Sequence, residues 1–508
     1  MSASPLTEPR PALSPRSRLR GLDPLVPLTA VVALAVYVTH GFDGGLTRDL
    51  GVYAYGGQQV AEGVPPYVAI VNRAGPLAHF LPGIGAWVAR LVGVDDVLGM
   101  RVFFLLIAVA CVVVTYLLAR DVFRSRATGV VAAAALLSVR GFVIYATYGP
   151  REKTPLVLFC ALALLAVVHR RWATAGFCIA LATLTWQPAF FALGAGAAVA
   201  ALLQAERRLG SLVRIAVGGL APLLAVVAAY AVVGDLKFFI DDFVLVNARY
   251  TEQVSLMTEP RIIWEATKEI YGWTTWLLIG GLVAVVLQAL ASVRSALRHD
   301  PRAAALVGMG VLAIVGALWS LKAYNGWPDC FFVFPVVMVG IGGLAPLLGR
   351  LLPRPALVAL VAVWAVVSVV ITTTYAVTTR NHDLDEQRRD VEAVQRVLPD
   401  ARIMSLEAPP ALVLAHQRNP TRFQLFGNGL TGYLDDVWPG GREGYARWVA
   451  RRAPELLAVG TESGHRSWLE GVLQRDFVLV GESPEWDWYV RPEVGPDRVE
   501  ELRRVLRD

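Results

Sequence analysis

The feature of this sequence that most restricts its fold is a series of long apolar runs. Between about Leu25 and Tyr375, nearly uncharged stretches of roughly 17 to 22 residues recur, and none follows Arg380. A helix of about 20 apolar residues crosses a bilayer core, where no water is present to pair with exposed backbone groups. Hydrophobic residues make up 55% of the chain and charged residues 17%, with a mean hydropathy of +0.51. The sequence therefore predicts an α-helical polytopic protein of the cell membrane.

The arginine clusters predict which loops face the cytoplasm, because short cytoplasmic loops are enriched in Lys and Arg. The clusters are Arg10 to Arg20, Arg120 to Arg126, Arg170 and Arg171, Arg207 to Arg214, Arg294 to Arg302, and Arg350 and Arg354. Placing all of them in the cytoplasm gives eleven spans, at about 25–42, 101–119, 129–147, 155–169, 172–188, 189–205, 213–233, 274–292, 304–320, 330–348 and 356–376. The N-terminus is then cytoplasmic and the C-terminal region extracytoplasmic. This parity requires residues 77–93 to be interfacial or re-entrant, and whether they span stays open.

Three regions follow from this topology. Residues 1–22 are a basic segment rich in Pro and Ser that is expected to be disordered. Residues 23–379 form a transmembrane module with outer loops 43–100, 147–154, 234–273 and 321–329. Residues 380–508 form an external α/β domain, because a helical run at Val391 to Leu398 alternates with β-like runs at Arg402 to Leu406, Leu456 to Val459 and Phe477 to Val480.

Several functional classes are excluded by missing patterns. The net charge of +6 is spread over membrane loops and forms no single stripe, so no nucleic-acid partner is expected. The sequence has no phosphate-binding loop, no strand-embedded GxGxxG and no G-x-S-x-G elbow, so no nucleotide is expected as a cofactor. The four cysteines lie in or beside apolar runs, which gives no support to a disulfide framework or a zinc site. No metal ligands are assigned, and whether a divalent cation assists is left open.

Two outer loops carry residues suited to group transfer. Asp49, just after the first span, is a candidate general base that accepts the proton of an attacking hydroxyl. The alternative is that it caps a helix from Leu50 to Ala61, since Asp is a favoured N-cap. In the second loop, Arg151 and Lys153 are candidates to neutralise a leaving lipid phosphate, with Glu152 as a second acid. These charges are equally suited to capping the helix that follows.

Other polar residues have simpler explanations. Arg140 is expected to extend toward the interface, with a role at the lipid phosphate as the alternative. The short loop with Lys322, Tyr324, Asn325, Trp327 and Asp329 resembles an interfacial aromatic belt. A second polar cluster, at Asp241, Asp242, Asn247, Arg249 and Tyr250, is expected to be solvated surface.

The order of several short motifs resembles the polytopic GT-C glycosyltransferases, most closely their family-39-like, protein-mannosyltransferase-related bacterial members. The matching positions are Asp49, Tyr53 and Tyr55, Glu62-Gly63, Pro65-Pro66-Tyr67, Pro76-Leu77, Arg151-Glu152, Trp186-Gln187-Pro188, Phe331 to Pro335, and Asn419 to Phe423. Two positions depart from the family pattern. The usual Lys/His-Pro-Pro of the first loop is Ala74-Gly75-Pro76, so Arg48 or Arg73 has to supply the cation of that motif. The family's Asp-Glu pair is Arg48-Asp49, which implies a different handling of the donor.

The resemblance implies a membrane glycosyltransferase, of hexosyl or pentosyl type, that takes a monosaccharide from a polyprenyl-phosphate-linked donor. Asp49 is implied as catalytic base and Glu152 as an assisting acid, and the acceptor is a glycan, lipid or protein of the cell envelope. The candidate substrate-binding residues are Arg48, Tyr53, Tyr55, Arg73, His79, Arg151, Lys153, Lys322, Tyr324 and Asn325. The rival functions are transport or flipping of a lipid-linked saccharide, and a non-catalytic scaffold in envelope assembly.

Overall fold

The computed structural model describes residues 23–204, 208–251, 259–324, 326–461 and 467–507, and all eleven predicted runs are helical in it. The basic N-terminal segment, Arg207 and Asn325 lie outside the described residues. Within the described part, six helical segments are long and apolar enough to cross a membrane, or seven if one bent pair is counted as a span. The prediction of a helical multi-pass membrane protein is therefore confirmed, whereas the number of eleven spans and the orientation stay predictions.

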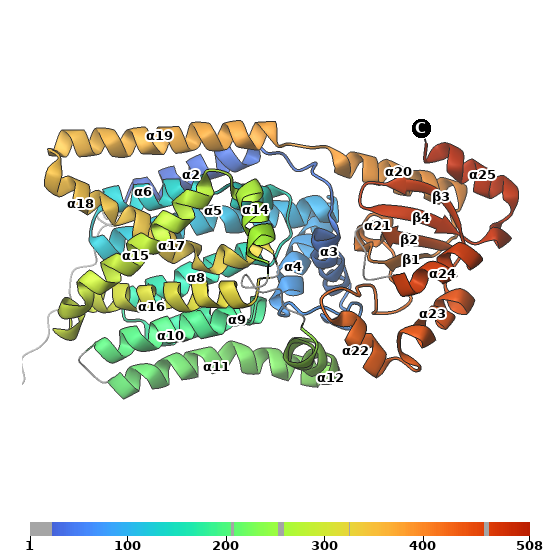
Figure 1. Ribbon diagram of the computed structural model, residues 1–508, viewed down its shortest axis with the longest axis horizontal. Helices are drawn as coiled ribbons and strands as arrows, with labels where there is room; N and C mark the ends of the chain where they lie inside the picture. Colours follow the sequence, from blue (N-terminus) through green and yellow to red (C-terminus); the bar gives the residue numbers. More distant parts are fainter. Residues whose placement is uncertain (1–22, 205–207, 252–258, 325, 462–466, 508) are drawn as a thin grey trace, which may run out of the picture.

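The helices of the membrane part run side by side along the long axis of the molecule (Figure 1). They are α2 (Leu25–Val38), α5 (Asp96–Phe123), α6 (Arg126–Leu137), α7 (Arg140–Thr147), α8 (Lys153–Val168), α9 (Trp172–Thr185), α10 (Ala189–Leu203), α11 (Arg208–Val233), α15 (Thr274–Leu297), α16 (Pro301–Lys322), α17 (Phe334–Gly342), α18 (Leu344–Leu351) and α19 (Arg354–Thr378). Exposed Val, Leu and Ile side chains cover the outer helices α11, α15 and α19, as expected for surfaces that face lipid.

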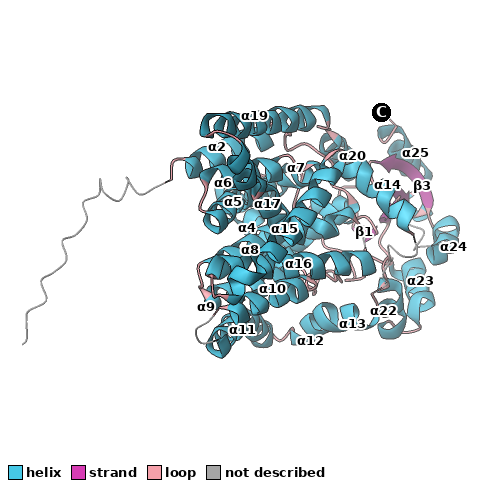
Figure 2. Cartoon of the chain, turned by 60° about the vertical axis from the view of Figure 1, so that its left-hand side comes forward, coloured by secondary structure: helices cyan, strands magenta, loops and turns pink. Residues whose placement is uncertain are grey.

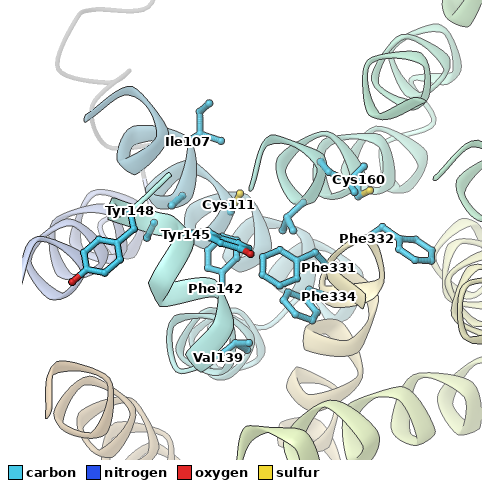
Figure 3. Close-up of a cluster of buried hydrophobic side chains, with 14 of the residues drawn as sticks. Ile107, Cys111, Val139, Phe142, Tyr145, Tyr148, Cys160, Phe331, Phe332 and Phe334 are labelled. Carbon is cyan, nitrogen blue, oxygen red and sulfur yellow. The ribbon is translucent and has the colours of Figure 1, made fainter. Parts of the chain in front are cut away.

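Two predicted spans are interrupted. The run at 129–147 is split into α6 and α7, which meet at an angle of 72°. The run at 330–348 begins with a 3-10 helix, η2 (Trp327–Val333), and breaks again at Gly343 between α17 and α18. The helix after the first break, α7, and η2 meet in an aromatic core, in which Phe142 and Tyr145 of α7 lie against Phe331 (Figure 3). This core places the loop after α7 beside η2.

The loops that are predicted to face outward contain helices of their own. Loop 43–100 contains α3 (Arg48–Ala61) and α4 (Leu77–Val92), which pack together between the membrane helices and the external domain (Figure 1). Loop 234–273 contains α12 (Leu236–Phe239), a π-helix η1 (Ile240–Val246), α13 (Asn247–Arg249) and α14 (Pro260–Tyr271). A π-helix is uncommon and is often found at functional sites.

The external domain contains a four-stranded sheet, whose strands are magenta in Figure 2. Its strands are β1 (Ile403–Leu406), β2 (Leu456–Gly460), β3 (Val478–Ser483) and β4 (Trp486–Val490), in the order β1-β2-β4-β3. Only the β1–β2 pair is parallel. The helices are α20 (Asp383–Val397), α21 (Pro409–Ala415), α22 (Leu430–Val437), α23 (Gly441–Arg452), α24 (Ser467–Asp476) and α25 (Pro496–Val505), with a 3-10 turn at Pro492–Val494.

The prediction of an α/β domain is confirmed, including three of its strands. The fourth strand, β4, was missed although it has the strongest alternation, with Trp486, Trp488 and Val490 buried. Its position at the centre of the sheet, between β2 and β3, explains why these large side chains are fully covered.

Candidate functional site

Asp49 lies in the first turn of α3, at the junction of the membrane part and the external domain. The helix is capped by Thr47, whose hydroxyl accepts a hydrogen bond from the Leu50 N–H at 3.4 Å, so the expectation that Asp49 is the cap is wrong. The Asp49 carboxylate instead binds two guanidinium groups. Its Oδ2 is 2.6 Å from Arg151 Nη1, and its Oδ1 is 3.3 Å from Arg48 Nη2. Because a neighbouring residue supplies the cap, the Asp49 side chain is free to serve another role.

Asp49 is ionised in this environment. Partial burial by itself would raise its pKa, but the charges of Arg151 and Arg48 and their hydrogen bonds outweigh burial and hold the pKa well below the usual range. The side chain is still 48% exposed. A substrate that enters this site therefore meets a carboxylate anion.

The second-loop charges form a buried chain of ion pairs. Arg151 Nε is 3.2 Å from Glu152, and Lys153 Nζ lies 3.4 Å from Glu152 and 3.0 Å from Asp329 of η2. These side chains are at most 10% exposed, so each charge needs its partner. Capping by Glu152 is not observed, since its side chain makes no hydrogen bond to the start of α8.

Aromatic rings lie against two of these cations, Arg151 and Lys153. Arg151 lies 5.4 Å from the centre of the Tyr53 ring and 5.6 Å from that of Tyr145, which belongs to the aromatic core in Figure 3. Lys153 Nζ lies 3.6 Å above the ring of Trp186. Cations over aromatic faces are favourable and fix the direction of the side chain. The interrupted helices that form the aromatic core thereby set the position of the ion pairs.

The ion-paired side chains around Asp49 and Glu152 line a cavity of about 490 Å³. Four basic and three acidic side chains line it: Arg48, Arg73, Arg151 and Lys153, and Asp49, Glu152 and Asp329. The remaining wall comes from α3 and the segment between α3 and α4, the turn after α9, the start of α10, η1, α13, the end of α16, η2 and the external domain. Its other residues are Val52, Tyr53, Asn72, Ala74, Trp186, Gln187, Pro188, Phe191, Phe243, Val244, Asn247, Ala248, Thr251, Trp319, Ala323, Pro328, Leu425, Gly427, Asn428 and Leu430.

Arg73 differs from the other cations of the cavity. Within the described residues, no carboxylate lies within ion-pair distance of its guanidinium, and no hydrogen bond of that group is found. Burial lowers its pKa, but an arginine remains charged. Arg73 is therefore the cation of the cavity that has no ion-pair partner among the described residues.

The backbone around Arg73 is held by neutral hydrogen bonds. Its carbonyl oxygen accepts from Gln187 Nε2 and from Asn247 Nδ2, both at 2.9 Å. Gly75 N–H donates to Thr185 O at 3.0 Å, and a Cβ at position 75 would lie 1.9 Å from Leu184 O. Glycine is thus required for this segment to lie directly against the end of α9.

His79 supports this segment and does not line the cavity. Burial lowers its pKa to about 4, so the ring is neutral, and its Nε2 lies 2.8 Å from Asn72 Nδ2. The ring fits because position 56 is glycine, where a Cβ would lie 1.8 Å from His79 Nδ1. The expected substrate contact of His79 is therefore replaced by a structural one.

Four further candidates lie away from the cavity or outside the described residues. Tyr55 is buried, and its hydroxyl accepts from Asn419 N–H at 3.1 Å. Lys322 is exposed at the end of α16, and the Tyr324 hydroxyl lies 2.9 Å from Thr267. Asn325 is not described. Proximity in sequence to a membrane boundary does not distinguish such residues from Asp329, which does reach the cavity.

The expectation of a solvated cluster at 241–250 is wrong for two residues. Asp242 is fully buried, ion-pairs with Arg422 of the external domain and accepts a hydrogen bond from Asn72 N–H at 3.2 Å. Asn247 binds Arg73 and lines the cavity. Arg140 lies with its guanidinium 5.0 Å from the centre of the Tyr375 ring and outside the cavity.

Several site residues were not predicted. Glu407 and Asn428 belong to the external domain, and no sequence pattern connects them with Asp49. Gln187 and Asp329 were noted as parts of motifs but were given no role. The polar character of Asn72 and Gln187 next to apolar runs was the one available signal. Within the described residues, no three His, Cys, Asp or Glu side chains are grouped as metal ligands.

Comparison with known proteins identifies the fold. No protein-family model matches the chain, and no curated protein sequence matches it. Among solved structures, ArnT from Cupriavidus metallidurans in the apo state matches with a TM-score of 0.62 and 13% identity, covering 92% of this chain and 97% of that chain. The same protein bound to undecaprenyl phosphate matches with a TM-score of 0.61 at the same identity and coverage. The oligosaccharyltransferase of Archaeoglobus fulgidus in the apo form matches with a TM-score of 0.51 and 14% identity, covering 86% of this chain and 69% of that chain.

Proposed function

Since the chain has the fold of the GT-C polytopic membrane glycosyltransferases, we propose that it transfers a monosaccharide from a polyprenyl-phosphate-linked donor to an acceptor hydroxyl. The observation that carries this proposal is one cavity that contains an ionised carboxylate, Asp49, and an arginine, Arg73, that forms no ion pair with any of the residues the structure describes. The first group suits proton removal from the acceptor, and the second suits a leaving phosphate. One structure with this fold is described as bound to undecaprenyl phosphate, which supports this class of donor.

The four cations of the cavity divide into two groups. Arg48 and Arg151 each contact two carboxylates, and Lys153 is enclosed by Glu152, Asp329 and the Trp186 ring. These three are needed to balance the buried acids. Arg73 is available, and we assign it as the main partner of the donor phosphate.

The reaction is a displacement at the anomeric carbon. The acceptor oxygen forms a bond to that carbon, its proton passes to Asp49, and the bond from the carbon to the phosphate oxygen breaks. The electron pair leaves with the polyprenyl phosphate, whose added negative charge is stabilised by Arg73. Attack opposite to the leaving phosphate inverts the configuration of the sugar.

Donor binding also adjusts the base. With two guanidinium groups on it, Asp49 has a low proton affinity, and a carboxylate in that state is a weak base. A donor phosphate competes with Asp49 for Arg151 and Arg48. As their contacts to the carboxylate weaken, its pKa rises. Asp49 then becomes a stronger base only when the donor is present.

The apolar part of the cavity suits the lipid chain of the donor. Val244 and Leu430 line it together with Phe191 and Trp319, whose rings stack at 5.6 Å. The side chain of Phe191 is exposed at the start of α10, a helix of the membrane part. A lipid-linked sugar can therefore enter from the bilayer while its phosphate reaches Arg73.

The orientation proposed is one with the cavity on the outer face. Two of the arginine loops predicted to be cytoplasmic contact each other, since Arg302 Nε donates to Asp121 O at 3.0 Å, and Arg120 and Arg126 of the first of them both pair with Asp23 at the start of α2. Positive charge in these loops supports a cytoplasmic location for them. Sugar transfer then uses extracytoplasmic donors and envelope acceptors.

The test is sugar transfer in membranes that contain the wild type, Asp49→Asn or Asp43→Asn, supplied with a panel of radiolabelled polyprenyl-phosphate hexoses and pentoses. Asp43 is a matched control because it lies in the same outer loop, outside the cavity, and pairs with Arg380. We expect transfer by the wild type and Asp43→Asn and none by Asp49→Asn. Equal transfer by all three proteins would refute the role of Asp49, and no transfer by well-expressed wild type from any donor would refute the proposed function.

A further inference from the structure

Glu407 occupies an unusual position between β1 and α21. Its side chain is 0% exposed, and its backbone has φ +63°, in the left-handed region that non-glycine residues seldom adopt. Burial of a carboxylate and a left-handed backbone both cost free energy. A residue with both features is stable only where specific partners compensate for these costs.

The partners of Glu407 lie on two different walls of the cavity. One carboxylate oxygen, Oε1, accepts hydrogen bonds from the backbone N–H groups of Phe426 and Gly427, the latter at 3.2 Å. The other oxygen, Oε2, lies 3.1 Å from Arg48 Nη1. Both Gly427 and Arg48 line the cavity. A single carboxylate of the external domain therefore joins the loop at 425–430 to the first turn of α3.

Arg48 transmits this constraint to Asp49. Its second terminal nitrogen, Nη2, is 3.3 Å from Asp49 Oδ1, so the guanidinium lies between the two carboxylates. A second acid of the external domain, Glu485 in the β3–β4 turn, accepts from the Arg48 backbone N–H at 3.3 Å. The side chain and the backbone of Arg48 are thus both held by the external domain.

We propose that Glu407 is a positioning residue for sugar transfer, which acts through Arg48 to orient Asp49 and through Phe426 and Gly427 to hold the loop that closes the cavity. This inference rests on the proposed function for its catalytic part. It makes the external domain a component of the reaction centre, since that domain supplies the buried carboxylate that holds Arg48. Glu407 itself does not line the cavity.

Two variants separate the arms of Glu407. Glu407→Gln keeps an oxygen that can accept from Phe426 and Gly427 but places a neutral amide beside Arg48. Glu407→Ala removes both arms. The matched control is Arg388→Gln, which breaks another ion pair between the external domain and the membrane part, to Asp95 at 2.7 Å, outside the cavity.

The kinetic test measures kcat and donor KM for these variants and for Arg48→Gln. We expect Glu407→Gln to lower kcat at least about tenfold with a donor KM within about threefold of the wild type, because a misplaced base affects the reaction more than donor binding. The double variant with Arg48→Gln should be no slower than Arg48→Gln alone, and Arg388→Gln should behave as wild type. A wild-type kcat in Glu407→Gln, or losses that multiply in the double variant, would overturn the proposal.

The second test does not require activity. Leu430, a buried residue of the loop, is replaced by Cys, and its reaction with a maleimide is timed in each background. We expect labelling to accelerate at least about fivefold in Glu407→Ala and to stay unchanged in Arg388→Gln. Unchanged labelling in Glu407→Ala would overturn the loop arm. If the wild type transfers no sugar, the proposed function fails, and the labelling rates alone decide whether Glu407 holds the loop.

Discussion

The two sides of the cavity are built by opposite means. On the Asp49 side, a charged carboxylate is balanced by Arg48 and Arg151, and the support comes from ion pairs that extend into the external domain. On the Arg73 side, the backbone is held by neutral hydrogen bonds from Gln187 and Asn247, and no carboxylate of the described part of the chain pairs with the charge. The difference teaches that the proposed base, Asp49, is kept ionised by its partners, whereas the proposed phosphate-binding cation, Arg73, is positioned through its backbone so that its charge remains available.

The largest effect is expected from Asp49→Asn. We predict that kcat falls by about 10² to 10⁴-fold, the range for loss of a general base. Binding of undecaprenyl phosphate should at the same time become tighter, because Arg48 and Arg151 lose their carboxylate. Transfer assays and lipid binding to the purified protein in detergent measure the two effects. Weaker lipid binding in this variant would contradict the assigned competition between Asp49 and the phosphate.

Arg73→Gln should have the converse effect. We predict a loss of about 10- to 100-fold in affinity for undecaprenyl phosphate, the contribution of a hydrogen bond to a charged group. The control is Arg249→Gln, an exposed arginine of the other long loop, 234–273, that does not line the cavity. Equal affinities for the two variants would show that another cation binds the phosphate.

Gly75→Ala tests whether the backbone positions Arg73. The added Cβ would lie 1.9 Å from Leu184 O, so the Arg73 segment has to separate from α9. We expect the free energy of unfolding to fall by about 1 to 3 kcal/mol, together with weaker lipid phosphate binding. Gly471→Ala, at a site with no atom within 4 Å of the added Cβ, is the control for both measurements. Lower stability with unchanged lipid affinity would separate the fold of this segment from its function.

The smallest effect concerns Asp242, which supports Asn72 beside Arg73. Burial raises the pKa of Asp242 to about 7, although Arg422 opposes the shift. Between about pH 4 and 7 the folded chain retains a proton that the unfolded chain has released, so stability from this group declines as pH rises through that window. Asp242→Asn removes this dependence. The difference in Tm between the variant and the wild type should therefore shift in favour of the variant from pH 4.5 to pH 8; a constant difference would contradict the shifted pKa.

The sequence by itself determined the membrane part, because spans in a bilayer have to be long, apolar and helical, and such runs are visible without any tertiary information. It also located Asp49, Arg73, Arg151 and Lys153, because charges between apolar runs are conspicuous. The strands β1, β2 and β3 followed from local apolar runs of the external domain in the same way.

Only the tertiary structure decided which of these cations are ion-paired and which candidate residues line the cavity. The assignment of Arg73 as the free cation depends on which carboxylates the other cations meet, and those partners lie up to 359 residues away along the chain, as in the Arg48–Glu407 pair. The exclusion of Tyr55 and His79 depends on helix faces that pack against Asn419 and Asn72. Local sequence indicates whether a segment lies in the bilayer or in water, whereas the partner of a buried charge is set by packing between elements that are distant in the sequence.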